Sequence, residues 1–136
     1  EFTKQEQLGY ELFIKHCNSC HTEPIFSTYG FANNGLPIDT TLNDYGKYRI
    51  TKVTKDSMKF KIPSLRNLSY SYPYMHDGRF TNLEEVIEHY NSGGNYSPTV
   101  DPLMKKIGVG LQLTNAEKQD LINFLKALSD YNFLNN

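Results

Sequence analysis

The sequence predicts a mainly α-helical chain with long loops. Three segments carry apolar residues at helical spacing, whereas residues 22–62 and 91–110 are rich in turn-forming residues. The chain has 136 residues, which suits one domain, and it shows no internal repeat or low-complexity tract. We therefore expect a single domain over residues 1–136.

The first segment with helical spacing covers residues 4–17, where Leu8, Leu12 and Phe13 precede a cysteine pair. We expect an amphipathic helix here that leads into the cysteines. In the loop region that follows, alternation of side-chain polarity in residues 48–53 predicts a short strand. Residues 64–68 are expected to form a short helix after Pro63.

The second and third expected helices share a start signal. Thr81 with Glu84, and Thr114 with Glu117, have the spacing of a capping box. The second helix is expected to end at the Gly93-Gly94 pair. The third continues to residue 128, and its apolar stripe consists of Leu121, Ile122, Leu125 and Leu128.

The charge balance excludes one group of functions as the first hypothesis. Lysine and arginine number 14 against 15 aspartates and glutamates, so the net charge is −1. Binding to nucleic acid or to acidic membranes is therefore not expected. No apolar run approaches the length of a membrane span, and the chain does not open on a signal peptide.

The two cysteines occur in the pentapeptide Cys17-Asn-Ser-Cys20-His21. Thiols at this spacing can add across the two vinyl groups of haem, and the next residue can present an imidazole to the iron. A redox disulfide would follow a βαβ pattern, which is absent here. Zinc would need further ligands, and His16, His76 and His89 are scattered. The motif therefore predicts one covalently attached haem c held by Cys17, Cys20 and His21.

Two other haem contacts are less directly indicated. Lys61, Arg66 and Arg79 are candidate partners for haem propionates, and Arg66 is favoured because it lies between Leu65 and Leu68. Spacing alone does not choose the second axial ligand of the iron. The candidates are Met58, Met75, Met104, His76, His89 and Tyr90. By pattern alone Tyr90 is a core aromatic, because it shares the apolar face of its helix.

Three further segments carry a family resemblance: Phe60-Lys-Ile-Pro-Ser-Leu-Arg-Asn67, Pro73-Tyr-Met-His-Asp-Gly-Arg-Phe80 and Leu83-Glu-Glu-Val-Ile-Glu-His-Tyr90. They resemble the C-terminal haem domain of the bacterial di-haem cytochrome c peroxidase and MauG family. The resemblance implies a class I cytochrome c-like fold with long loops around a low-spin, electron-transferring haem. It also implies Tyr90 as the distal iron ligand, because this position lies fourteen residues after His76, with Met75 as the second choice.

These observations lead to an expected function. We expect a monohaem c-type cytochrome, located in the periplasm, that passes single electrons to or from a redox partner protein. The alternatives are a haem peroxidase that reduces hydrogen peroxide, or part of a larger peroxidase or MauG-like enzyme. Because the net charge is close to zero, a salt-tolerant encounter with the partner is expected.

Overall fold

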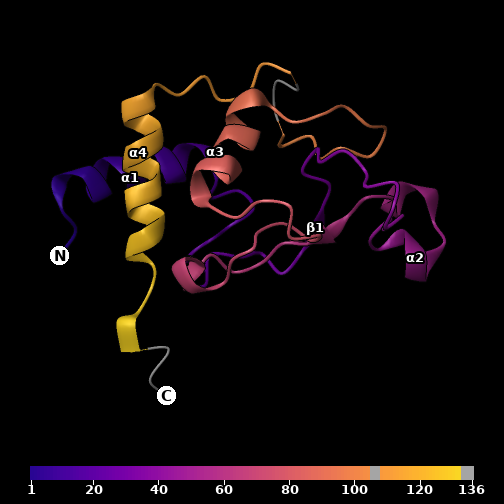
Figure 1. The fold of residues 1–136 in the computed structure, drawn as a ribbon, viewed down its shortest axis with the longest axis horizontal. Helices are drawn as coiled ribbons and strands as arrows, with labels where there is room; N and C mark the ends of the chain where they lie inside the picture. The colour runs from indigo at the N-terminus through magenta and orange to yellow at the C-terminus, as the bar shows by residue number, and fades with distance from the viewer. Residues whose placement is uncertain (105–107, 133–136) are drawn as a thin grey trace. The chain divides into compact units, whose positions relative to one another are not determined.

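The computed structural model describes residues 1–104 and 108–132, and these are mainly helical (Figure 1). A two-stranded antiparallel sheet pairs Phe31 with Lys61 and Ala32 with Phe60. The predicted mainly α class is confirmed. In chain order the elements are α1 (Lys4–His16), β1 (Phe31–Ala32), α2 (Tyr48–Thr51), the 3₁₀ turn η1 (Thr54–Asp56), β2 (Phe60–Lys61), the 3₁₀ turn η2 (Leu68–Tyr70), α3 (Leu83–Ser92) and α4 (Asn115–Ala127).

The chain divides into two compact units. The first contains Glu1–Thr28, Pro63–Glu88 and the segment from Leu113 onward, and the second contains Tyr29–Ile62 and His89–Gln112. Helix α3 begins in the first unit and ends in the second. The single domain over residues 1–136 stays a prediction. No helix in the described ranges is long and apolar enough to cross a membrane.

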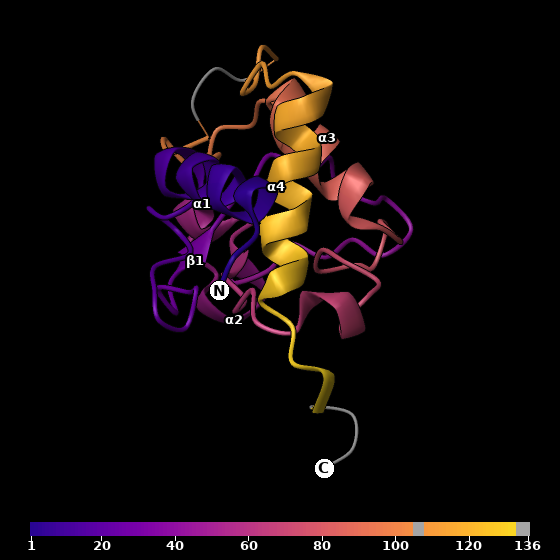
Figure 2. The same ribbon diagram turned by 90° about the vertical axis from the view of Figure 1, so that its left-hand side faces the viewer.

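The core of the first unit forms where α1 crosses α4 (Figure 2). Gly9 lies at the crossing, and a Cβ atom built there would overlap the Asp120 carbonyl and lie 2.8 Å from Phe124 Cβ. The missing side chain therefore permits the close approach of the two helices. The buried core residues are Phe13, Phe26, Leu68, Leu83, Ile87, Leu121, Ile122, Phe124 and Leu125.

Side-chain caps fix where the three long helices begin. The capping box of α4, between Thr114 and Glu117, is confirmed. An equivalent box between Thr3 and Glu6 starts α1, and our sequence analysis missed it although the spacing is visible. Helix α3 begins one residue later than predicted, because Asn82 Oδ1 accepts from the Glu85 amide at 2.9 Å.

Two expectations about short elements were wrong. Residues 48–53 do not form a strand, because Tyr48–Thr51 is one helical turn that ends at Lys52 in the left-handed region, at φ 56°. Residues 64–68 do not form a helix, because Asn67 takes a positive φ of 61° and the 3₁₀ turn η2 begins only after it. Single turns of this kind depend on tertiary contacts more than on periodicity.

A buried asparagine organises the second unit. The Asn33 side chain donates to Ser97 Oγ at 2.8 Å and to Thr99 Oγ1 at 3.0 Å, and its Oδ1 accepts from the Gly35 amide at 2.9 Å. Its carbonyl accepts from the Asp101 amide at 2.9 Å. Because both polar groups of the Asn33 side chain and its carbonyl have partners, its burial is stabilised, and it joins the chain near β1 to residues 97–101.

Candidate haem-binding site

The cysteine motif forms a tight turn at the end of α1. Cys17 caps the helix and donates its amide to the Phe13 carbonyl at 2.8 Å. Its own carbonyl accepts from the amides of Cys20 at 3.1 Å and His21 at 3.0 Å. Both thiols are reduced. The turn therefore places the two predicted attachment residues and the predicted iron ligand on one short loop of the first unit.

The Cys17 thiol lies against the hydrophobic core of that unit. Burial, and to a lesser extent the neighbouring Cys20, raise the pKa of the Cys17 thiol to about 12. At neutral pH this thiol is therefore protonated. A protonated, partly buried thiol behaves as a small apolar side chain, which fits a position beside an apolar macrocycle.

His21 is oriented by two main-chain carbonyls, one in its own loop and one from a segment far along the chain. Its Nδ1 lies 3.1 Å from the Phe26 oxygen and 3.2 Å from the Pro63 oxygen. A carbonyl only accepts, so Nδ1 carries the hydrogen, and Nε2 is the nitrogen that can coordinate a metal. Burial lowers the pKa of His21, against the opposing effect of the two carbonyls. The neutral imidazole is the form that binds iron.

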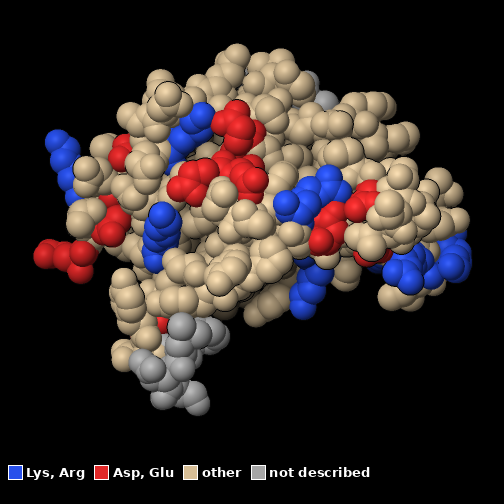
Figure 3. All heavy atoms as spheres, in the orientation of Figure 1, with Lys and Arg blue, Asp and Glu red and all other residues tan. Residues whose placement is uncertain are grey.

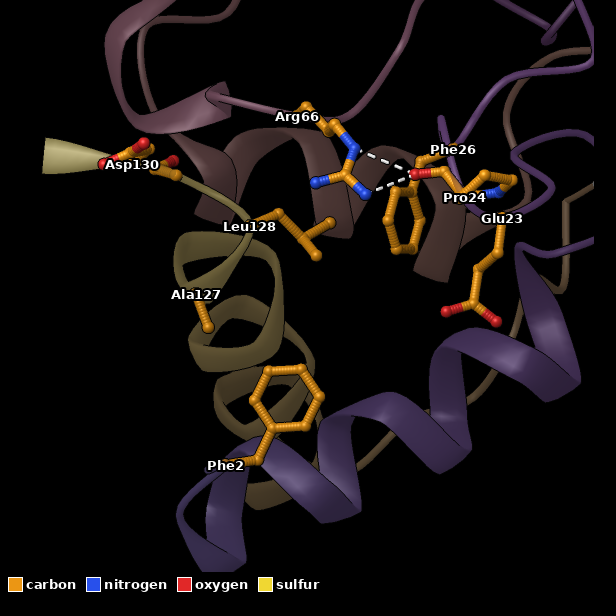
Figure 4. A pocket seen from close by; sticks show the side chains of 9 residues that line it. Phe2, Glu23, Pro24, Phe26, Arg66, Ala127, Leu128 and Asp130 are labelled. Atoms are coloured by element: carbon orange, nitrogen blue, oxygen red, sulfur yellow. Dashed lines mark hydrogen bonds between the residues drawn. The ribbon is translucent and has the colours of Figure 1, made fainter. Parts of the chain in front are cut away.

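Residues 63–66 hold the loop that follows the motif, and we name them the Pro63–Arg66 clamp. Beside the Pro63 contact to His21, Ser64 Oγ donates to the Ile25 carbonyl at 2.5 Å. Arg66 donates from Nε at 2.8 Å and from Nη2 at 2.5 Å to the Pro24 carbonyl (Figure 4). Three successive contacts therefore fix residues 21–26 against a segment about forty positions later in the chain.

Arg66 is thus engaged in a contact that sequence analysis did not foresee. Its guanidinium carbon also lies 5.3 Å from the centre of the Phe26 ring. The same side chain borders a cavity of about 420 Å³ between the loop and the end of α4, with Phe2 and Leu128 also in its wall (Figure 4). Arg66 remains accessible from this cavity, and its predicted role toward a haem propionate stays a prediction.

Tyr90 belongs to the second unit, near the end of α3. Its hydroxyl oxygen accepts from Asn34 Nδ2 at 3.3 Å. The neighbouring His89 donates from Nε2 to the Asn34 carbonyl at 2.8 Å. Asn34 therefore holds two consecutive side chains of α3, and sequence analysis gave no signal for it, because asparagines before a glycine are common in loops and do not indicate a contact with a distant helix.

The other candidates for the second axial position lie in different surroundings. Met58 is buried in the second unit, which also contains Met104. Met75 and His76 belong to the first unit, in a turn where Met75 has a φ of 73°. His76 Nε2 lies 3.9 Å from the carboxylate of Asp77. The first unit thus contains Cys17, Cys20, His21 and Arg66, whereas Tyr90 lies in the second.

The chemistry of the first-unit loop suits haem c and not a protein-held metal ion. Two reduced thiols and an imidazole with Nε2 available are the groups that covalent haem attachment uses. Among residues 1–104 and 108–132, no group of three or more His, Cys, Asp or Glu side chains is placed to hold a metal ion.

Comparison with known proteins agrees with the fold and the motif. The family model for cytochrome c matches residues 6–129, so the chain belongs to the cytochrome c family. A cytochrome-c peroxidase, IdrP1 of Pseudomonas sp. (strain SCT), is 37% identical over 83% of this chain and 36% of that protein. The methylamine utilization protein MauG of Methylorubrum extorquens is 36% identical over 88% of this chain and 33% of that protein.

Solved structures show the same relationship. A MauG-like protein associated with microbial copper homeostasis has a TM-score of 0.81 and 33% identity, over 97% of this chain and 49% of that one. The diheme peroxidase BthA of Burkholderia thailandensis, at 23% identity and a TM-score of 0.79, shares the fold. The predicted cytochrome c fold and the resemblance to peroxidases and MauG are confirmed, and a cytochrome c domain implies covalently bound haem c. The chain spans about a third of the length of the two curated relatives.

Proposed function

We propose that this chain is a monohaem electron-transfer domain, in which Cys17 and Cys20 form the thioether bonds and His21 Nε2 binds the iron. The observation that carries the proposal is the His21 imidazole, whose Nδ1 is held by the Phe26 and Pro63 carbonyls. Haem c, when bound, supplies a reversible one-electron couple between ferric and ferrous iron. The residues around it set the potential of that couple.

The protein's contribution at His21 is orientation and basicity. A carbonyl that accepts from Nδ1 fixes the tautomer and increases electron density at Nε2, which favours the ferric state. The Pro63–Arg66 clamp keeps both acceptors in place, because it contacts His21 itself and the carbonyls of Pro24 and Ile25 in the loop that follows. A rigid ligand environment suits electron transfer, since little has to move when the charge on the iron changes.

We propose that Tyr90 would supply the second protein ligand to the iron of a bound haem. The Asn34 amide donates toward the Tyr90 oxygen, and such a donor stabilises the phenolate form over the phenol. An anionic oxygen ligand favours ferric iron and gives a low reduction potential. Arg66, which borders the open cavity, is proposed to contact a haem propionate.

The proposal also covers partner and location. A domain that moves one electron at a time needs a redox partner protein to supply or remove it. Similarity to proteins named cytochrome-c peroxidase and MauG supports a role in oxidoreductase chemistry. We propose the periplasm as the compartment, the location expected from the family resemblance.

The test is magnetic circular dichroism of the ferric holo-protein, combined with potentiometric titration, for wild type and Tyr90→Phe. We expect a low-spin, six-coordinate spectrum that becomes high-spin in Tyr90→Phe, with a rise in potential of about 60 mV or more, equivalent to a tenfold shift for one electron. Tyr96→Phe is the matched control, because Tyr96 is 76% exposed in the same unit. Identical spectra and potentials for wild type and Tyr90→Phe would show that Tyr90 is not a ligand.

The names of the relatives favour one second candidate, a peroxidase. In that case the ferric spectrum would be high-spin before any substitution, and hydrogen peroxide would be turned over with a reduced cytochrome as electron donor. His76, 12% exposed and beside Asp77, would then be the group available to move a proton. Steady-state turnover that is lost in His76→Phe would replace the electron-transfer proposal with the peroxidase.

A further inference from the structure

The net charge of −1 conceals an uneven distribution along the chain. Residues 29–62 carry six lysines and arginines against three aspartates, whereas the remainder carries eight against twelve. The excess of positive charge gathers around α2 and η1, where blue atoms are prominent in Figure 3. The second unit therefore presents a basic surface within a nearly neutral protein.

The centre of this surface is a run of seven residues, 49–55, all of them exposed. It contains Arg49, Lys52 and Lys55, no acidic residue, and the two aliphatic residues Ile50 and Val53. Ile50 is 88% exposed and Val53 is 43% exposed. We call residues 49–55 the basic tip. Aliphatic side chains surrounded by charge are typical of a protein-binding surface.

Of the three cations in the basic tip, only Arg49 has a carboxylate partner among the described residues. Asp56 is buried and lies 3.6 Å from Lys47, so its charge is directed inward. Asp44 accepts from the Gly46 amide at 3.0 Å and lies 3.7 Å from Arg49. The structure assigns no carboxylate partner to Lys52 or Lys55 among the residues it describes.

The aromatic rings of the second unit argue against nucleic acid as the occupant. Proteins that bind single strands stack bases on open aromatic faces. Here Lys47 Nζ lies 5.3 Å from the Phe31 ring centre, Lys61 Nζ lies 5.6 Å from that of Tyr29, and Lys52 Nζ lies 5.9 Å from that of Tyr48. A lysine therefore lies over one face of each of these three rings, where a base would otherwise stack, and the basic tip itself contains no aromatic residue.

We propose that the basic tip is the docking surface for the redox partner, and that the partner presents an acidic protein surface with an apolar centre. The inference rests on the proposed electron-transfer function and adds the chemistry of its partner. Complementary charge brings such partners together quickly, and the small aliphatic centre lets them separate after one electron has moved. The net charge alone predicts a salt-tolerant encounter with the partner, whereas docking through the basic tip predicts a salt-sensitive one.

The test uses holo-protein and a reduced flavodoxin as an acidic one-electron donor, followed by stopped-flow absorbance. For wild type we expect the second-order rate constant to fall about tenfold between about 10 mM and 300 mM ionic strength. At the lower ionic strength, Lys52→Glu/Lys55→Glu should react about tenfold more slowly than wild type. Ile50→Ser should weaken binding without altering the salt dependence, since it removes apolar contact only.

The matched control is Lys4→Glu/Lys15→Glu, which makes the same change in net charge on exposed positions of α1. We expect this control to stay within about twofold of wild type, because a local surface and not total charge governs docking. Equal slowing in both double variants would overturn the proposal. So would binding of phosphatidylglycerol vesicles or of a labelled single-stranded oligonucleotide that is lost in Lys52→Glu/Lys55→Glu, since the tip would then serve a different class of partner.

A cationic donor separates failure of docking from failure of the proposed function. Reduced methyl viologen should reduce wild type and Lys52→Glu/Lys55→Glu at least equally fast, because it does not need the basic tip. If both are reduced and flavodoxin shows no preference, the docking proposal fails and electron transfer stands. If the ferric iron cannot be cycled by either donor, the proposed function itself fails.

Discussion

At the scale of single residues, Asp77 is the buried charge whose effect on stability can be stated most directly. Its side chain is 3% exposed, and Arg79 Nε lies 2.9 Å and 3.1 Å from its two oxygens. Hydrogen bonds from the Arg79 side chain hold the pKa of Asp77 below its ordinary value, despite burial. The ionised pair therefore stabilises the folded state.

We predict that Asp77→Asn lowers the free energy of unfolding by about 2 kcal/mol near neutral pH, the value typical of hydrogen bonds to a charged group. The pKa of Asp77 is lower in the folded state than its unfolded value of roughly 3.9. The stabilisation by the ionised Asp77 is therefore complete at pH values above about 3.9, and it is lost as the pH falls through the folded-state pKa. Urea unfolding at pH 7 and at lower pH measures this. Glu11→Gln, at an exposed position of α1, is the control. If the difference in unfolding free energy between Asp77→Asn and wild type does not become smaller on acidification, the prediction is contradicted.

Some candidate residues of the site can be predicted from the sequence, and others cannot, for a physical reason. Cys17, Cys20 and His21 are adjacent, and their side chains carry the chemistry, so a five-residue window is enough to identify them. The groups that orient His21 are carbonyls of Phe26 and Pro63, and a carbonyl leaves no signature in the sequence. The predicted role of Arg66 toward a haem propionate stays a prediction, and its contact with Pro24 could not be foreseen because it depends on a fold that brings residues 24 and 66 together.

At the scale of elements, the α1–α4 crossing reverses the usual effect of a glycine-to-alanine substitution on stability. Gly→Ala within a helix normally stabilises by about 1 kcal/mol. At Gly9 the added methyl group would overlap the Asp120 backbone, so we expect Gly9→Ala to destabilise by about 2 kcal/mol or more, as overpacking does. Thermal unfolding of the holo-protein measures it. Gln7→Ala, exposed on the same helix, is the control and should leave stability unchanged or raise it. If Gly9→Ala also raises stability, the helices do not cross closely at this point.

The long helices could be predicted, and the short elements could not. Helices α1, α3 and α4 each bury one face of a sustained apolar pattern, and capping residues mark their starts. Helix α2 has four residues and no buried side chain, so its sequence shows no apolar face. Residues 48–53 alternate in polarity, which is the pattern typical of a strand. In an exposed segment no face is buried, so this alternation does not separate a strand from a helical turn.

At the scale of the whole molecule, the apolar content points to dependence on the bound group. Only 38% of residues are hydrophobic, and the second unit buries few apolar side chains among those described, chiefly Leu36 and Met58. The proposed haem c would add apolar contact that the chain itself lacks. We therefore expect overall stability to depend on the two thioether bonds.

We predict that Cys17→Ser/Cys20→Ser loses haem under denaturing electrophoresis and melts at least about 7 °C lower than wild type, the shift expected for a loss of roughly 2 kcal/mol in a domain of this size. Circular dichroism at 222 nm and haem staining measure the two effects. Cys20→Ser alone should keep one bond and stain. Retention of haem by the double variant after denaturation would show that attachment does not use these cysteines.

The two carbonyls at His21 limit how this site can be transplanted. Residues 17–26 look like a portable cassette, because they hold the cysteines, the histidine and one carbonyl acceptor. The second acceptor, Pro63, lies 42 positions away, and the clamp residues that steady the loop stand beside it. A designer who grafts the cassette onto another scaffold must therefore carry the later segment along, or rebuild its carbonyl in the host. Homology in the motif alone does not guarantee the same imidazole geometry.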